Sequence, residues 1–395
     1  MDRLLKELDW LDGESEAMAA QLIEWAAINS GSDNMEGLTE MLGALRKAFA
    51  PLGADEEILT FPWIESIDND GDTTTLPCGA AYNLTKHESA PIQLLLVGHM
   101  DTVFSKTSSF QKLEQINGRL HGPGVADAKG GLMVMLKALE TLERSPMAGK
   151  VGWEVFINGN EEIGSQGSGK WLADHAKGKS FALVFEPSPV DGAFISSRWG
   201  SINLALIAQG RAAHVGRDFA SGQNAITALS CLTLALDELN DEETIVNIGT
   251  FHGGDAANVV PEKAFAKINI RSASQEAMKE TEKVINTLIR EMEKTASIKF
   301  NQLLLSKRPP KPFNEKSEEL YLTIAKTAKE LGQSMEWKSS GGVCDGNLLA
   351  AAGLPTIDTM GPIGDKIHTH EEWVDINSLV ERAKLAALIM MKATH

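Results

Sequence analysis

The sequence QLLLVGHMDTVF, residues 93–104, sets the architecture that we expect for the whole chain. Its apolar run 94–97 predicts a buried central strand of a parallel sheet. The strand delivers His99 and Asp101 at its carboxyl end, where open α/β sheets bind their ligands. His99 offers an imidazole that suits zinc. Asp101 is expected to accept the other ring N–H of His99 and so to fix its tautomer.

A second stretch, HGPGVADAKGG at residues 121–131, predicts a Gly-rich turn that opens a helix over 130–144. Asp127 lies in that turn, and a carboxylate there can bridge two cations because each oxygen can bind one. Taken alone, a histidine after a strand is more often structural, and an aspartate before a helix is more often an N-cap. The case for a metal site therefore depends on acids at other strand ends.

Two further strands end in acidic residues. The strand predicted at 151–157 is followed by the pair Glu161 and Glu162, and the strand at 181–185 leads into Glu186. Three successive strands thus end in His, Glu-Glu and Glu. Because parallel strands present their carboxyl ends at one edge, these residues together predict a metal site.

Composition limits the class of protein. The chain has 395 residues and a formal net charge of −17, which argues against nucleic acid or an anionic membrane as a partner. Its three cysteines are far apart and predict neither a disulfide framework nor a cysteine-type zinc site. We find no signal peptide and no run of about 20 apolar residues. A cytoplasmic protein is therefore expected.

The middle of the chain changes character and predicts an inserted domain. Its elements suggest a small antiparallel sheet with two helices, an α+β module, expected as strands at 194–208, 244–251, 263–271 and 298–305 and helices at 223–238 and 274–294. We expect an α/β chain with a mixed, mostly parallel sheet and helices on both faces in residues 1–195 and 309–395. Residues 196–308 would form the inserted, ferredoxin-like domain.

The motifs, in their order along the chain, resemble one family. The dinuclear-zinc amidohydrolases and exopeptidases include glutamate carboxypeptidase of the carboxypeptidase G type, succinyl-diaminopimelate desuccinylase, acetylornithine deacetylase and the aminoacylases. The resemblance covers nearly the full chain and rests on GHMDTV, GPGVADAKGG, NGNEEIGSQGS, FEP, GRAAHVG, SSGGVCDGN and IHTHEEWVDI.

The resemblance implies two zinc ions, for which cobalt or manganese could substitute. One ion would be bound by His99, Asp127 and Glu186. The other would be bound by Asp127, Glu162 and His368. Glu161 would be the general base for the water that attacks the amide, and Asp101 would orient His99. His370 competes with His368 as a ligand, but the family places the ligand four residues before the Glu of Glu372-Trp373-Val374, which favours His368.

The resemblance also implies a homodimer formed through the inserted domain, which would act as a lid. His214 would reach the partner's active site and stabilise an oxyanion, and Asn258 would approach the substrate. Arg271 would bind a substrate carboxylate, assisted by the backbone at Gly342. Val343 and Cys344 stand where many relatives carry Thr and Ser, which puts the substrate in doubt. We expect Cys344 to be a packed, inert thiol.

The function implied is hydrolysis of the amide bond of an N-acyl or N-peptidyl amino acid with a free carboxylate, most like a glutamate carboxypeptidase. Its substrate would be a small molecule or short peptide. A deacylase acting on acetyl or succinyl groups is the first alternative. A non-catalytic metal-binding scaffold is the second, and the presence of every ligand and of the base argues against it.

Overall fold

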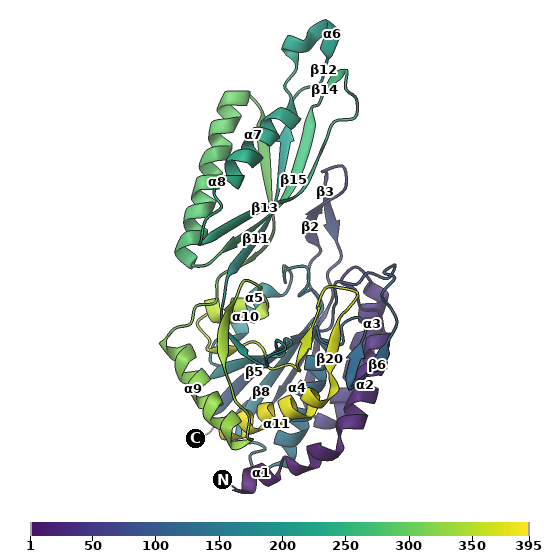
Figure 1. Cartoon of the computed structure of the whole chain (residues 1–395), viewed down its shortest axis with the longest axis vertical. Helices are drawn as coiled ribbons and strands as arrows, with labels where there is room; N and C mark the ends of the chain where they lie inside the picture. The colour runs from purple at the N-terminus through teal and green to yellow at the C-terminus, as the bar shows by residue number, and fades with distance from the viewer. Residues whose placement is uncertain (1, 394–395) are drawn as a thin grey trace.

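The computed structural model describes residues 2–393 and consists of two stacked lobes (Figure 1). The lower lobe holds both ends of the chain and is built on a six-stranded sheet. The upper lobe is built on a four-stranded sheet. None of the helices in the described part of the chain has the length and apolar character needed to cross a membrane.

The lower sheet is mixed and mostly parallel, as expected. Only β4 runs against the other strands. In spatial order the strands are β1 Asp55–Leu59, β4 Ala81–Lys86, β8 Val151–Asn158, β5 Ile92–His99, β9 Phe181–Val184 and β18 Thr356–Ile357.

Helices cover both faces of this sheet, which explains the continuous apolar run in β5. Leu94 and Leu96 enter the larger core, whereas Leu95 and Val97 enter a smaller one on the opposite face. The larger core is covered by α1 Asp2–Lys6, α2 Ser15–Ala27, α3 Met35–Phe49, α4 Lys129–Arg144, α9 Glu315–Glu330 and α11 Ile376–Lys392. The smaller core is covered by α5 Gly169–His175 and α10 Asp345–Ala351.

The upper lobe has the βαββαβ order and the strand arrangement of a ferredoxin-like fold. Its antiparallel sheet has the order β13, β15, β11, β16, and two helices pack on one face around a separate core. The bounds are β11 Gly200–Gln209, α7 Ala225–Asp237, β13 Thr244–Gly253, β15 Lys263–Ser272, α8 Gln275–Ala296 and β16 Lys299–Arg308.

The single strand expected at 194–208 is wrong, because the chain changes lobes within it. β10 Phe194–Arg198 pairs with β17 Trp337–Ser340 in the lower lobe, and β11 begins at Gly200 in the upper sheet. The segment after β16, which returns the chain to the lower lobe, runs beside the segment between β10 and β11. Arg198 and Lys311 exchange two backbone hydrogen bonds of 3.0 Å each, so the two crossings are joined.

A hairpin that the sequence did not predict connects the lobes. β2 Ile64–Ile67 and β3 Thr73–Leu76 rise from the lower lobe to the uncovered face of the upper sheet (Figure 1). There Ile67 packs in a small core with Ala205, Ile207 and Phe265.

A second unpredicted sheet stands at the rim of the lower lobe. Its strands are β19 Gly364–Asp365, β20 Trp373–Asp375, β7 Arg119–His121 and β6 Glu114–Ile116.

Candidate metal centre

The structure brings all five expected metal ligands to one edge of the lower sheet. His99 ends β5, Glu162 follows β8, and Glu186 follows β9. Asp127 comes from the turn before α4, and His368 from the loop between β19 and β20.

Asp127 lies between the two imidazoles and presents one carboxylate oxygen to each. Its Oδ1 is 3.1 Å from Nε2 of His99, and its Oδ2 is 3.2 Å from Nε2 of His368. Glu186 Oε1 lies 3.7 Å from Nε2 of His99, and Glu162 Oε2 lies 3.2 Å from Nε2 of His368. This geometry groups the ligands into two sets that share Asp127.

The electrostatics of the site favour added positive charge. Burial lowers the pKa of His99, but Glu186, Asp101 and Asp127 outweigh it and raise that pKa well above its usual value. Hydrogen bonds to Asp127 and Glu162 raise the pKa of His368 to about 11. Burial, followed by the charge of Asp127, raises the pKa of Glu162 to about 7. The shifts of the two histidines share one cause, which is the excess of carboxylates around their imidazoles.

The donor set fits divalent cations. Ligand atoms of His99, Asp127 and Glu162 all lie within 4.8 Å of one another. Oε1 of Glu162 is buried without a hydrogen-bond partner in the described chain. Imidazole and carboxylate ligands suit zinc and its first-row neighbours.

Asp101 supports the centre differently from our expectation. The backbone carbonyl of Asp101 lies 2.9 Å from Nδ1 of His99, whereas the nearest carboxylate oxygen of Asp101 is 3.5 Å away. The carboxylate instead accepts the backbone N–H groups of Glu161 and Glu162, at 3.1 Å each, and the hydroxyl of Ser32 at 2.8 Å. One residue thus fixes both the first histidine and the paired glutamates.

Glu161 lies beside the ligands and contacts an arginine that the sequence did not single out. Its Oε1 is 2.7 Å from Nη2 of Arg308, an ion pair without hydrogen-bond geometry. The same nitrogen donates to the backbone oxygen of Glu161 at 2.8 Å, and it lies 3.3 Å from Asp345. Burial raises the pKa of Glu161 well above its usual value, although Arg308 opposes this. Arg308 ends β16, so the upper lobe reaches the candidate base directly.

In the sequence, Glu372 served only to choose between His368 and His370. In the structure it supports the turn that carries Asp127. Its carboxylate accepts the backbone N–H groups of Ala126 at 2.9 Å, Asp127 at 3.1 Å and Gly124 at 3.2 Å. Burial, together with the charge of Asp127, raises the pKa of Glu372 to about 8. No sequence signal indicated this contact, which joins residues about 245 positions apart.

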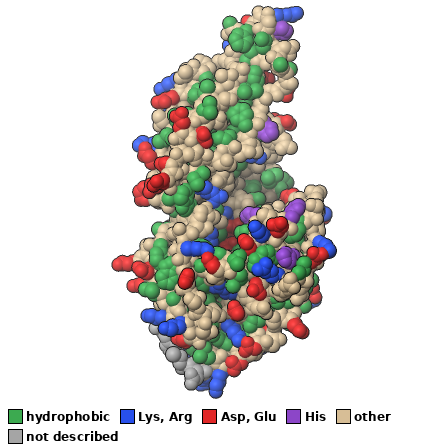
Figure 2. Space-filling model, in the orientation of Figure 1, with side chains coloured by type: hydrophobic (Ala, Val, Ile, Leu, Met, Phe, Trp, Pro, Cys, Tyr) green, Lys and Arg blue, Asp and Glu red, His purple; other side chains and the backbone are tan. Residues whose placement is uncertain are grey.

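A cleft of about 550 Å³ extends from the metal ligands to the base of the upper lobe. Figure 2 shows the molecule hollowed between the lobes. Arg271 lines the cleft, and its Nη1 is 3.4 Å from the carbonyl of Gly341. Gly342 also lines it, but its N–H is donated to Ser340. Cys344 is buried, and burial raises its pKa well above the usual value, as an inert thiol requires.

Three histidine and asparagine side chains stand away from this cleft. His370 stacks on Phe110. His214, in β12 Ala213–His214, and Asn258, before β14 Val259–Val260, lie at the far tip of the upper lobe (Figure 1). The backbone carbonyl of Asn258 there accepts the N–H of Val215. Within one chain, the structure does not bring His214 or Asn258 to the metal centre.

The fold and this centre define a metal-dependent hydrolase of the metallopeptidase and amidohydrolase class. The model of peptidase family M20/M25/M40 matches residues 95–392, and the chain belongs to that family.

Individual relatives agree with this assignment. Carboxypeptidase G2 of Pseudomonas sp. (strain RS-16) is 28% identical over 306 residues, covering 75% of this chain and 73% of the relative. Succinyl-diaminopimelate desuccinylase of Thioalkalivibrio sulfidiphilus is 27% identical over 355 residues, covering 85% of this chain and 88% of the relative. A tripeptidase structure from Staphylococcus aureus superposes with a TM-score of 0.73 at 23% identity, covering 96% of this chain and 99% of that one.

Proposed function

We propose that this protein is a two-zinc hydrolase that releases a C-terminal amino acid, with glutamate as the leading candidate, from N-acyl or N-peptidyl substrates. It would work as a cytoplasmic homodimer. The observation that carries the proposal is Asp127, shared between two imidazoles, beside a cleft lined by Arg271. The similarity to carboxypeptidase G2 supports release of a C-terminal residue. Glutamate is the leading candidate because the sequence motifs resemble those of glutamate carboxypeptidases.

The chain's residues divide into ligands, base and substrate contacts. His99, Asp127 and Glu186 would hold one cation, and Asp127, Glu162 and His368 the other. Bound cations would polarise the scissile carbonyl and lower the pKa of the attacking water. Glu161 would take the proton from that water and pass it to the departing nitrogen.

Arg271 would bind the substrate carboxylate. It lines the cleft on the side of the upper lobe, and a guanidinium can grip a carboxylate with two parallel hydrogen bonds. His214 and Asn258 would complete the cleft of a partner subunit, because they are exposed at the tip and remote from their own.

A substrate panel tests the proposal. Purified protein, zinc-loaded or stripped with a chelator, is incubated with N-blocked glutamates, other N-acyl amino acids and dipeptides, and free amino acid is measured. Metal-dependent release of glutamate is expected. Release from acetylated or succinylated amino acids alone would assign the deacylase instead, which the similarity to a desuccinylase supports.

Glu161→Gln separates catalysis from metal binding. The variant should retain its metals and lose turnover, because an amide cannot accept the proton. Unchanged turnover would remove Glu161 from the mechanism. A wild-type protein that binds two metals and releases nothing from any substrate would support a scaffold.

A further inference from the structure

One arginine of the cleft between the lobes has no counter-ion. Arg198 lies 2.7 Å from Asp358, and Arg308 lies 2.7 Å from Glu161. Arg271 also lines the cleft and is half-buried, but it forms no ion pair with any of residues 2–393. Burial, followed by the charge of Arg308, lowers its pKa. Because a buried charge without a partner is unfavourable, the surroundings of Arg271 favour binding of an anion.

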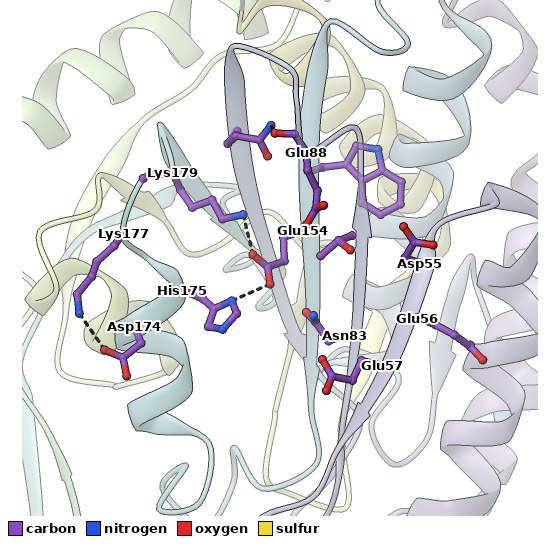
Figure 3. Close-up of a pocket in the computed structure, with 14 residues that line it drawn as sticks. Asp55, Glu56, Glu57, Asn83, Glu88, Glu154, Asp174, His175, Lys177 and Lys179 are labelled. Carbon is purple, nitrogen blue, oxygen red and sulfur yellow. Dashed lines mark hydrogen bonds and ion pairs between the residues drawn. The ribbon is translucent and has the colours of Figure 1, made fainter.

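Another hollow of the lower lobe shows the contrast. It lies over β1, β4 and β8, where the buried carboxylate of Glu154 has Lys179 at 2.6 Å and His175 at 2.8 Å (Figure 3). The chain itself compensates this buried charge, whereas it leaves the charge of Arg271 free for a ligand.

A row of polar side chains holds Arg271 on the face of the upper sheet opposite to its two helices. The Nε of Arg271 donates to Oδ1 of Asn269 at 2.9 Å, and Nδ2 of Asn269 donates to Oδ1 of Asn203 at 2.7 Å. Nδ2 of Asn203 donates in turn to the hydroxyl of Ser306 at 2.8 Å. The register of the sheet makes the row possible, because Asn203 pairs with Asn269 in β15 and with Ser306 in β16. We call these four residues the amide row.

The direction of these hydrogen bonds follows from the arginine. A guanidinium can only donate, so Asn269 must turn its carbonyl oxygen toward Arg271 and its NH2 group toward Asn203. Asn203 must then present its oxygen to Asn269, which leaves its own NH2 group for Ser306. The amide row therefore has one consistent orientation, and it fixes the Nε edge of the guanidinium.

These contacts leave one edge of Arg271 for a ligand. A carboxylate can accept two parallel hydrogen bonds from a guanidinium, either from Nε and Nη2 or from Nη1 and Nη2. Asn269 occupies Nε. Nη1 has only the carbonyl of Gly341, at 3.4 Å, and Nη2 has no acceptor within the described chain. The edge formed by Nη1 and Nη2 is thus the one that can receive a carboxylate.

We propose that Asn269 is a positioning residue that selects substrates with a free carboxylate. Through the amide row it orients the guanidinium of Arg271, and as a neutral acceptor it leaves the positive charge of Arg271 for the substrate. An aspartate at this position would hold the arginine in the same place but would neutralise it. The inference rests on the proposed function, in which Arg271 binds the substrate carboxylate.

Titration calorimetry tests this on full-length, metal-loaded protein that carries Glu161→Gln, so that the ligand is not cleaved. The ligands are N-acetyl-glutamate and its α-amide, in which a neutral amide replaces the α-carboxylate. Asn269→Asp should raise Kd for N-acetyl-glutamate about tenfold, as for loss of a charge-assisted hydrogen bond, and change Kd for the α-amide less than about twofold. Asn269→Ala should raise Kd for N-acetyl-glutamate only about threefold, because the guanidinium keeps its charge and loses only its orientation.

A purely structural role predicts the opposite order, since aspartate keeps the shape of asparagine and alanine does not. That order, or equal losses for the two ligands, would overturn the proposal. The matched control is Asn301→Asp, which makes the same change at an exposed position toward the other end of β16. Equal weakening by Asn301→Asp would show only general repulsion from an acidic protein and would also overturn it. So would the absence of N-acetyl-glutamate binding at millimolar concentration.

Kinetics of the active enzyme separate this inference from the proposed function. With Glu161 intact, Asn269→Asp should raise KM for an N-acyl glutamate and leave kcat within about twofold, because the carboxylate contact serves ground state and transition state alike. A fall in kcat at unchanged KM would contradict a positioning role in carboxylate binding. A protein that cleaves no substrate, yet binds N-acetyl-glutamate with the expected order of variants, would refute the proposed hydrolysis and retain the role of Asn269.

Discussion

At the metal centre, some acidic residues face the histidines and others hold the backbone. Asp127 faces the histidines directly. Asp101 and Glu372 contact backbone N–H groups instead, and they hold the segments that carry Glu161, Glu162 and Asp127. Since backbone donors cannot rotate away as side chains can, this arrangement fixes ligand positions before any cation binds.

Glu372→Gln should weaken metal binding while the fold is kept. The neutral amide offers one acceptor oxygen to the three N–H groups that the carboxylate now serves. Loss of such support typically lowers metal affinity about 10–100-fold. Competition with a chromophoric chelator measures the metal affinity of the variant and of the wild type.

Glu371→Gln is the matched control, because this neighbour is exposed. Similar metal affinities for Glu372→Gln and the wild type would show that the contact does not position Asp127.

The positions of the candidate ligands were predictable from sequence, whereas two of the contacts that support the site were not. His99, Glu162 and Glu186 follow strands, so strand prediction alone placed them together. The contact of Glu372 with the Asp127 turn and that of Arg308 with Glu161 depend on tertiary packing across long sequence separations. Asp101 was placed correctly at the site, but which of its atoms contacts His99 depends on local backbone geometry.

At the level of elements, the hairpin β2–β3 extends from the lower lobe and packs against the upper sheet. Its tip meets the upper sheet, where Asp72 pairs with Lys263 at 2.5 Å. Gly71, in the turn, has φ +75°, and a Cβ there would lie 2.3 Å from the ring of Phe265. The turn therefore requires glycine for both its conformation and its close approach.

Gly71→Ala should destabilise the protein by about 2–3 kcal/mol, combining left-handed strain with a steric clash. Gly118→Ala is the control, since Gly118 has φ +78° but no atom within 4 Å of an added Cβ. Only strain remains there, about 1 kcal/mol. Urea denaturation compares the two variants. Equal losses would mean that the hairpin tip does not press on the upper sheet.

The prediction of helices and strands succeeded where the periodicity was clear. It failed for the short strands of the hairpin and for the strand that was expected to continue across the boundary between the lobes. The helices expected at 130–144 and 274–294 are α4 and α8, within two residues at each end. The hairpin was missed because its strands have four residues each. The strand at 194–208 was wrong because alternation continues unbroken from β10 into β11 although the two strands join different sheets.

In the molecule as a whole, one buried aspartate contacts both segments in which the chain crosses between the lobes. Asp358 lies 2.7 Å from Nε of Arg198 and 3.0 Å from Nζ of Lys311, and all three are buried. Asp358→Asn should leave these cations uncompensated and cost about 3–5 kcal/mol. Asp70→Asn, exposed at the hairpin tip, is the control. Urea midpoints that match for the two variants would contradict this role.

Activity should require two subunits if His214 serves the partner's cleft. Glu161→Gln and His214→Ala homodimers are each expected to be inactive. Mixing and refolding them should give hybrid dimers with one intact cleft and about a quarter of wild-type turnover in a statistical mixture. Differently tagged subunits allow the hybrid to be purified. A hybrid without activity would place the complete cleft within one chain.

The joined crossings at Arg198 and Lys311 have a consequence for how this chain can vary. The segment between them, 112 residues long, leaves and re-enters the lower lobe at neighbouring backbone positions. A short turn could span the same gap, so the path of the lower lobe does not depend on the length of the inserted segment. We therefore expect its loops, length and surface to diverge without altering the path of the chain through the lower sheet, except where Arg271, Arg308 and the hairpin tip make contacts between the lobes.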